Sequence, residues 1–485
     1  MSVIGIDVGT STCKGVLLAK NGQIVGQVQQ NYRQKPSVFD DKAEMDAEVF
    51  KDGVFAVIKK LAKMAEKADV VEALALSTHG ETLIPVDESG KALRPALLSM
   101  DRRCVAQKER IGKELGANKF YEICGTPLHT QYPMPKIMWL KENEPQTVEK
   151  TATYCTTQDY LHLALGVGRF VDYSLASRFG GFDIHAKKWS DEILKIVGVN
   201  ANNFSTPAVA GSVIGTIPKS IANELGVGDN VVVVLGGHDQ PCSALGMGAA
   251  ENTMTVSAGS YECISMMTNE PLNGNEGYRY GLNSYCHVID GKYITLAFFA
   301  SGLMVGWFID KFCAGGQTLQ EMENIVPAGN TGICFTPHAY GSMNPCWNDQ
   351  AKAKIVGVSA ETGLGGLYKA LLEGTSCELD LNVQVLEKLS HKAQDLHFCG
   401  GGTKSDLWMQ LRADILNRTI YRLDNGVDCS CMGAAILAGV GCGMFADAED
   451  ALQKIRYTKT AFQPRNAGAY SKQKQNYLAL TGVQL

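Results

Sequence analysis

The sequence lacks any surplus of basic residues. Its 485 residues carry 45 lysines and arginines against 50 aspartates and glutamates, which gives a formal net charge of −5. A dedicated nucleic-acid binder needs a positive excess to neutralise phosphates, so we expect no nucleic-acid partner. A small anionic ligand needs no such excess, because backbone amides at glycine-rich turns can bind phosphate.

Long apolar runs and closely spaced cysteine pairs are also missing. No apolar run approaches the roughly 20 residues of a membrane span, and the opening Met1–Asp7 lacks the basic segment of a signal peptide. The 15 cysteines are scattered and form no CxxC, which argues against a zinc site or a secreted disulfide framework. We therefore predict a cytoplasmic chain without a membrane span, whose cysteines are mostly buried thiols.

Four common catalytic signatures are absent. The sequence has no GxxxxGK[ST], which disfavours a P-loop nucleotidase, and no GxGxxG after a strand, which disfavours a dinucleotide-binding domain. It also has no GxSxG, the turn that carries the nucleophile of many hydrolases. A metal-binding HExxH is missing as well.

The length and a hydrophobic content of 45% predict two or three well-packed domains. An apolar strand at 3–6, a small polar turn and a return strand at 14–19 open the chain. The same plan recurs at 253–266, about 250 residues later, and this repeat indicates two related α/β domains with a boundary near 245–251. Other expected elements are helices at 47–67, 407–416, 432–440 and 448–455 and strands at 71–76, 231–235 and 396–399.

The first turn, from Asp7 to Lys14, combines groups that suit a phosphate. Glycine, threonine and serine offer amides and hydroxyls to phosphate oxygens, while Lys14 adds a positive charge. Asp7 at the strand end can hold Mg²⁺ through water. A plain β-hairpin turn explains the same residues equally well.

Asp239 follows a buried strand and the segment Gly236–His238. Open α/β sheets bind ligands at the carboxyl ends of their strands, where this carboxylate could accept a proton from a hydroxyl that attacks phosphorus. The alternative is a helix N-cap, since Pro241 stands where a helix would begin.

Other candidate positions are small-residue turns and polar groups at strand ends. The glycines at 400–402 let the backbone approach a flat ligand, and 257–260 forms a second phosphate-contacting turn; flexible loops are the alternative reading. Thr78, His79, Asp101 and Arg102 supply donors and acceptors for a polyol, although each could be an ordinary loop residue.

Taken in order, these motifs resemble the FGGY family of carbohydrate kinases, with the xylulokinase-like branch most similar. The glycine loop that continues into the helix at 407–416 is the most specific part of the resemblance. It implies an actin-like ATPase (ribonuclease H-like) fold, with two duplicated α/β domains flanking a central cleft. Residues 1–246 would form the sugar-binding domain and residues 247–485 the ATP-binding domain.

The resemblance also implies roles for single residues. Asp239 would be the catalytic base and Asp7 the Mg²⁺-associated carboxylate. Positions matching ATP and phosphate contacts are Thr10, Ser11, Lys14, Gly259, Ser260, Gly401, Gly402 and Asn417. Positions matching sugar contacts are Thr78, His79, Asp101, Arg102, Arg178, Asp239 and Gln240.

Departures from the family pattern fall on the sugar side, which leaves the acceptor open. Residues 97–100 carry no aromatic residue where one is usual, and Gln131 and Gly366 replace other residue classes in two family signatures. Xylulose is the favoured acceptor, with ribulose, gluconate, glycerol, erythritol and fuculose as alternatives. The resemblance also suggests a homodimer. Two other classes of function are an actin-like nucleotide switch and a catalytically silent sugar sensor.

Overall fold

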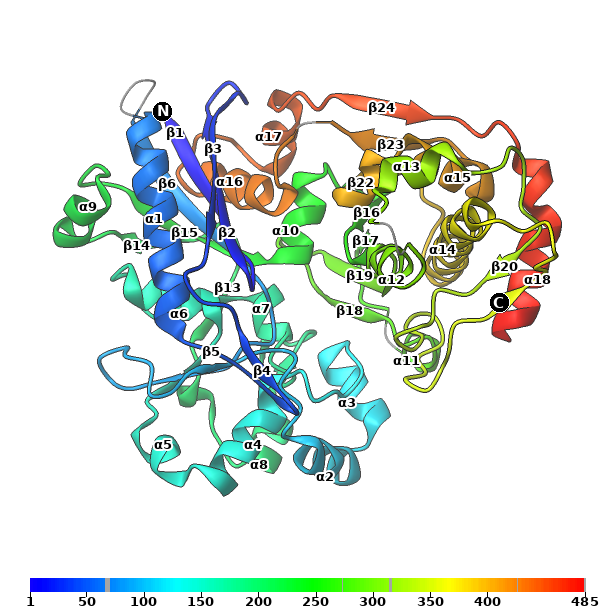
Figure 1. Cartoon of the computed structure of the whole chain (residues 1–485). Helices are drawn as coiled ribbons and strands as arrows, with labels where there is room; N and C mark the ends of the chain where they lie inside the picture. The colour runs from blue at the N-terminus through cyan, green and yellow to red at the C-terminus, as the bar shows by residue number, and fades with distance from the viewer. Residues whose placement is uncertain (66–69, 273, 314–315, 425, 484–485) are drawn as a thin grey trace.

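The chain forms two α/β lobes, each built on one large sheet (Figure 1). The computed structural model describes residues 1–65, 70–272, 274–313, 316–424 and 426–483. The first sheet has the strand order β14-β15-β6-β1-β2-β3. Its strands are β1 (Ser2–Val8), β2 (Thr12–Ala19), β3 (Ile24–Asn31), β6 (Val71–Thr78), β14 (Val213–Thr216) and β15 (Val232–His238).

The second sheet has the order β18-β19-β17-β16-β22-β23-β24. Its strands are β16 (Thr253–Ala258), β17 (Tyr261–Thr268), β18 (Asn283–Cys286), β19 (Tyr293–Ala300), β22 (Asp395–Cys399), β23 (Ile420–Leu423) and β24 (Lys459–Phe462).

Five strands of each sheet follow one plan. The row β3-β2-β1-β6-β15 corresponds to β19-β17-β16-β22-β23: the first three strands of each row are antiparallel, and the last two run parallel to the third. This shared plan confirms the predicted pair of related α/β domains with the actin-like fold. The carboxyl ends of the parallel strands in both sheets face the junction between the lobes (Figure 1).

The expected elements are present, with shifted ends. Asp7 lies inside β1 rather than in the turn, because β1 pairs with β2 and β6 along its whole length. Residues 236–238 extend β15, and a bulge lets Gly236 press against the backbone of Leu76. The following helix begins at Asp239, two residues before Pro241. Helix α1 spans Ala47–Ala65, and the last expected residues, 66–67, lie outside the described residues.

A helical insertion separates β6 from β15; in Figure 1 most of it lies beneath the first sheet, and α9 lies to the left of α1. Side chains of the insertion share one apolar core with Tyr285 and Leu296 of the second lobe, so the insertion also packs against β18 and β19. Its helices are α2 (Val105–Leu115), α3 (Ala117–Cys124), α4 (Pro133–Asn143), α5 (Pro145–Lys150), α6 (Thr157–Ala164), α7 (Tyr173–Ser177), α8 (Asp191–Val197) and α9 (Lys219–Leu225).

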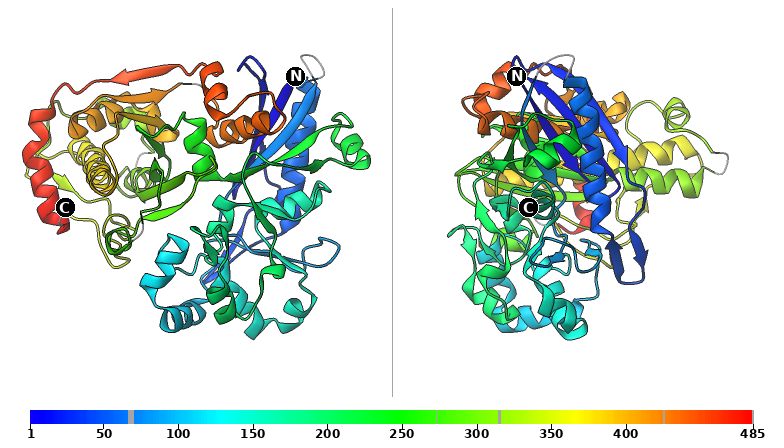
Figure 2. Two further views of the ribbon diagram at one scale, coloured as in Figure 1. Left: turned by 180° about the vertical axis from the view of Figure 1, so that it is seen from behind. Right: turned by 90° about the vertical axis from the view of Figure 1, so that its left-hand side faces the viewer.

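Helices pack around the second sheet, and α18 lies at the outer edge of this lobe (Figure 2). They are α12 (Gly302–Phe312), α13 (Leu319–Asn324), α14 (Leu364–Leu389), α15 (Asp406–Leu416) and α18 (Ser471–Thr481). Across the described part of the chain, no helix is long and apolar enough to cross a membrane.

Two helices cross between the lobes. α10 (Asp239–Gly246) follows the last parallel strand of the first sheet, and α16 (Cys429–Gly441) holds the equivalent place after the second. α16 returns to the first lobe, where its side chains join the apolar core of β1, β2 and β6 (Figure 1).

Glycines let these two helices touch backbone to backbone. A Cβ at Gly246 would lie 1.9 Å from the carbonyl oxygen of Cys429, and one at Gly433 would lie 1.9 Å from that of Cys242. No side chain fits at such distances, so the crossing requires glycine on both helices.

We expect Gly433→Ala to destabilise the protein by about 1–3 kcal/mol, because the added methyl group forces α10 and α16 apart. The matched control is Gly306→Ala in α12, where a Cβ would meet nothing within 4 Å. Alanine favours a helix over glycine, so this control should be neutral or slightly stabilising. Chemical denaturation of both variants measures the difference, and equal unfolding midpoints would contradict the packing argument.

Candidate active site

Acidic side chains and one lysine gather where the two lobes meet. Asp7, near the end of β1, accepts a hydrogen bond of 3.0 Å from the Ser77 hydroxyl. Burial raises the pKa of Asp7 well above its ordinary value, and the charges of Asp428 and Asp239 raise it further. Lys14 on β2 forms an ion pair with Asp428 at 2.7 Å.

Asp428 belongs to this group but was missed by the sequence argument. It is the N-cap of α16, and its Oδ1 accepts hydrogen bonds from the backbone N–H groups of Ser430 and Cys431. An aspartate directly before an apolar helical run is a recognisable cap signal. Burial disfavours the charge on Lys14, but Asp428 outweighs it, so the pKa of Lys14 is raised.

Two small-residue turns border this region. Thr10 and Ser11 form the turn between β1 and β2, and Ser11 is exposed. Gly259 and Ser260 form the exposed turn between β16 and β17. Their carbonyl groups accept hydrogen bonds from the start of α12, which fixes this turn.

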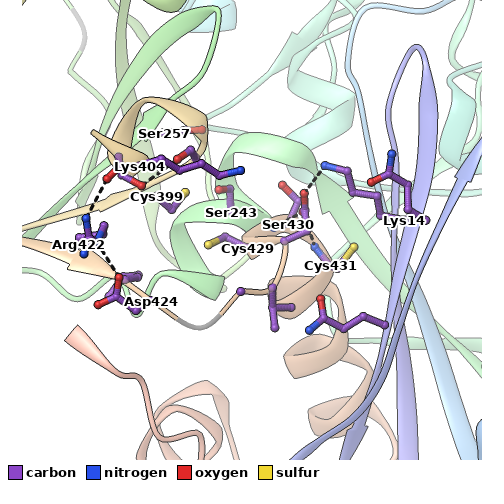
Figure 3. Close-up of a pocket in the computed structure, with 18 of the residues that line it drawn as sticks. Lys14, Ser243, Ser257, Cys399, Lys404, Arg422, Asp424, Cys429, Ser430 and Cys431 are labelled. Carbon is purple, nitrogen blue, oxygen red and sulfur yellow. Dashed lines mark hydrogen bonds and ion pairs between the residues drawn. The ribbon is translucent and has the colours of Figure 1, made fainter. Parts of the chain in front are cut away.

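A cavity of about 1180 Å³ opens beside the acidic group (Figure 3). Its wall joins β2 of the first lobe to the glycine loop after β22 and the start of α16. Residues on this wall include Lys14, Ser257, Gly400, Thr403, Asp428 and Ser430.

Gly401 and Gly402 lie beside this cavity, whereas Asn417 lies elsewhere. The two glycines are the first residues of a short 3₁₀ helix, Gly401–Lys404. Their neighbours Gly400 and Thr403 both line the cavity. Asn417 caps the far end of α15 in a left-handed conformation and lines a second cavity. α15 has 11 residues, so at 1.5 Å per residue Asn417 stands about 16 Å beyond the loop.

Asp239 is the first residue of α10, and its side chain is 30% exposed. Burial raises its pKa to about 7, with a further contribution from the charge of Glu81. His238 lies 3.2 Å from its Oδ1 through Nε2, and the other ring nitrogen of His238 lies 2.7 Å from the hydroxyl of Tyr285. Burial holds the pKa of His238 well below its usual value, so the ring is neutral.

Arg178 connects the two lobes near Asp239. Its guanidinium donates to Glu81 at 2.5 Å and to Asn283 of β18 at 3.1 Å. It also lies over the rings of Tyr132 and Tyr285, at 5.2 and 4.9 Å from their centroids. Asn283 and Tyr285 were not singled out from the sequence, because their proximity to Arg178 depends on the packing of the insertion against β18.

Three of the expected sugar-side residues lie within the framework. Both ring nitrogens of His79 are engaged, with the carbonyl oxygen of Val8 at 2.8 Å and the Thr157 hydroxyl at 3.0 Å. Asp101 is fully buried, where it accepts hydrogen bonds from the Ala43 N–H and from the Arg103 side chain. Thr78 is likewise fully buried at the end of β6.

The remaining two differ in their surroundings. Arg102 is exposed, and its backbone N–H donates to the carbonyl oxygen of Asp41. Gln240 is half-buried and hydrogen-bonds the Asp239 carboxylate. The structure therefore brings Gln240, Arg178 and Asp239 into one neighbourhood.

Lys136 is a buried lysine that holds three loops together. Its ammonium donates to the backbone carbonyls of Glu81, Leu98 and Gln131 at 3.0, 2.6 and 2.6 Å. Burial lowers its pKa to about 8. Lys136 lies in α4, which begins at Pro133.

The donor set suits a divalent cation carried with phosphates. Among the described residues, no three histidine, cysteine or acidic side chains form a metal cage. Mg²⁺ does not require one, because it usually binds through one or two carboxylates together with waters and substrate phosphates. The like charges that raise the pKa of Asp7 are the kind that a cation neutralises.

Two lobes on one strand plan, with carboxylates at the strand ends between them, are typical of the actin-like ATPase fold. The chain belongs to the FGGY family of carbohydrate kinases. Residues 2–246 match the family's N-terminal domain, and residues 254–442 match its C-terminal domain. The protein is therefore a sugar kinase that uses ATP as phosphoryl donor, as the sequence resemblance predicted.

Relatives with different acceptors match over nearly the full length. The chain is 26% identical to a xylulose kinase of Bacillus subtilis over 471 residues, which are 96% of this chain and 93% of the relative. It is also 26% identical to an L-fuculokinase of Escherichia coli, over 96% and 97% of the two chains. A gluconate kinase structure from Lactobacillus acidophilus superposes with a TM-score of 0.90 at 23% identity, covering 99% and 97%.

We expect Glu81→Gln to lower the pKa of Asp239, because it removes a nearby negative charge and leaves Arg178 free to attract the carboxylate. The acid limb of activity should move to lower pH by about one unit or less. Breaking the buried pair with Arg178 should also cost about 3 kcal/mol of stability.

The pH dependence of kcat/KM and the unfolding midpoint measure both effects. The control is Glu142→Gln, whose exposed partner Arg110 lies at 2.6 Å. Surface pairs contribute little, so this variant should match the unaltered enzyme. An acid limb that stays in place in Glu81→Gln would contradict the assigned coupling.

Proposed function

We propose that the protein transfers the γ-phosphate of ATP to a hydroxyl group of a ketose or polyol, with xylulose the first acceptor to test. The observation that carries the proposal is the placing of Asp239. Its carboxylate is partly exposed, its pKa is about 7, and it lies within electrostatic range of Asp7. Asp7 in turn interacts with the charges of Lys14 and Asp428, which line the cavity. This chain of charges supports a proton acceptor close to the proposed phosphate-binding region.

We assign sugar binding and ATP binding to different lobes. Residues 1–246 would bind the sugar, around Asp239, Gln240 and Arg178, and residues 247–485 would bind ATP. The glycine loop on the cavity wall supports the second assignment, since glycine lets a backbone approach a nucleobase or ribose closely.

The phosphates would lie between the two small-residue turns. Thr10 and Ser11 from one lobe and Gly259 and Ser260 from the other would present amides and hydroxyls, and Lys14 would add charge. Lys14 can do so because its pKa is raised, so it stays protonated at neutral pH. Asp7 would hold Mg²⁺, which when bound neutralises charge on the phosphates.

Asp239 would take the proton from the acceptor hydroxyl as that oxygen attacks phosphorus. A pKa near the working pH suits this task, because about half of the carboxylate is ionised at neutral pH and that form is still basic. Neutral His238 at 3.2 Å supports the geometry: if Tyr285 donates to Nδ1, Nε2 carries hydrogen and can donate to the carboxylate. Closure of the lobes over the sugar would keep water from the γ-phosphate.

The choice of xylulose is supported by the similarity to xylulose kinases. Similar relatives named for gluconate and fuculose make these two sugars the next acceptors to test. We also propose a cytoplasmic location and a homodimer. The location is supported by the cysteines, of which ten of 15 are buried and all are free thiols, as expected in a reducing compartment.

A coupled ADP-release assay across ketoses, aldonates and polyols tests the proposed acceptor class. We expect ADP release to depend on sugar and to be fastest with xylulose, because closure around the correct acceptor assembles the site. Release that no sugar stimulates would identify a nucleotide switch. Sugar binding seen by calorimetry without ADP release would identify a silent sensor.

We expect Asp239→Asn to bind ATP and sugar but to lose about 10²–10⁴-fold in turnover, because asparagine cannot accept the proton. The folded variant should be at least as stable as the unaltered protein, since burial disfavours the aspartate charge. Turnover, calorimetric binding and the unfolding midpoint measure these effects. Turnover at the unaltered rate would remove Asp239 from the mechanism.

The rate should also depend on pH in one direction. A base with a pKa of about 7 is protonated below that pH, so kcat/KM should fall as the solution is made more acidic and level off above about pH 8. The sugar-dependent rate between pH 5 and pH 9 measures this. An acid limb near pH 4 would mean that Asp239 is not the titrating base.

A further inference from the structure

Two cysteines from distant segments meet in the cavity. Cys399 is the last residue of β22, and Cys429 is the first residue of α16. Both line the cavity wall, and both are half-buried. In Figure 3 their side chains lie on the same part of the cavity wall, and Cys399 is near enough to Cys429 to raise the pKa of the Cys429 thiol. Thirty sequence positions separate them, so only the fold makes them neighbours.

This pair differs from the other thiols of the chain. Ten cysteines are buried, and burial in apolar surroundings makes a thiol inert. Cys346 is exposed, but no described contact joins it to another cysteine. Cys263 and Cys442 are half-buried, but neither lines this cavity. Cys399 and Cys429 combine proximity with access from the cavity, and both favour disulfide formation.

We propose that Cys399 and Cys429 are a modification site, at which a hydroperoxide forms a reversible disulfide that shuts the cavity. The proposal rests on the nucleotide role proposed for this cavity. The Cys399 thiolate attacks the O–O bond of hydrogen peroxide, which yields a sulfenic acid and, after protonation, one water. The Cys429 sulfur then attacks the sulfenic sulfur while its S–H proton passes to the departing hydroxide, which leaves as the second water. The two thiols lose two electrons, and the peroxide gains them.

The order of the two sulfurs follows from their contact. The hydrogen bond to Cys399 and burial raise the pKa of Cys429 well above its usual value, so Cys429 stays protonated and donates its S–H. Cys429 is therefore the second sulfur to react, and Cys399 is the attacking one.

The new disulfide would affect both nucleotide binding in the cavity and the movement of the two lobes. Cys399 directly precedes the glycine loop at 400–402, and Cys429 directly follows Asp428, which holds Lys14 at 2.7 Å. The bond would also join β22 of the second sheet to α16, which packs against the first sheet. A link of this kind restrains the closure that a kinase needs, so the oxidised enzyme should be inactive.

Peroxide treatment of the purified, reduced protein without nucleotide tests the proposal. We expect non-reducing peptide mapping to find a Cys399–Cys429 disulfide, sugar-dependent activity to fall about tenfold or more, and dithiothreitol to restore both. ATP added before the peroxide should slow formation of the bond, because it would occupy the cavity. A mapped disulfide between other cysteines, or none, would overturn the proposal.

Serine variants separate this bond from other oxidative damage. Cys399→Ser and Cys429→Ser, each compared with its own reduced activity, should change by less than about twofold after peroxide. Cys346→Ser removes the exposed thiol and should still lose activity as the unaltered enzyme does. Inactivation that persists in both pair variants would overturn the proposal. If the reduced protein phosphorylates no sugar, the proposed function fails, while the peptide map still decides whether the thiols pair.

Discussion

The close crossing of α10 and α16 is the constraint on which the site depends. Each helix follows the last parallel strand of a different lobe, and Gly246 and Gly433 let their backbones touch. Asp239 begins one helix and Asp428 caps the other, so the crossing sets the spacing of these two carboxylates. A wider crossing would move Asp239, the proposed proton acceptor, away from the ion pair between Lys14 and Asp428.

The site is held together at a cost in electrostatic free energy. Burial and like charges raise the pKa of both Asp7 and Asp239, so their ionised forms are less favourable in the folded protein than in the unfolded chain. Such groups favour folding when protonated, and they oppose it increasingly as pH rises through their folded pKa. A cation and the phosphates around it would change this balance, which couples ligand binding to the stability of the junction between the lobes.

The proposed acceptor side is arranged around charges that the protein itself satisfies. Arg178 pairs with Glu81 and reaches Asn283, so this neighbourhood includes groups from both lobes. The Lys136 ammonium donates a hydrogen bond to the backbone carbonyl oxygen of Glu81 and so holds this backbone in place. His79 and Asp101 have their polar atoms engaged by the framework, which leaves Asp239, Gln240 and Arg178 as the neighbourhood where differences between relatives would act.

The sequence by itself determined the elements and their class, since strand periodicity, turn residues and the repeated opening depend on local chemistry. It also marked the ends of β1 and β15 as the places for Asp7 and Asp239. Only the tertiary structure decided which side chains meet. Asp428, Glu81, Tyr285 and the Cys399–Cys429 contact come from segments far apart in the chain, and Asn417 is carried away from the cavity by the length of α15. No local pattern encodes such distances, because they are fixed by how helices and sheets pack against one another.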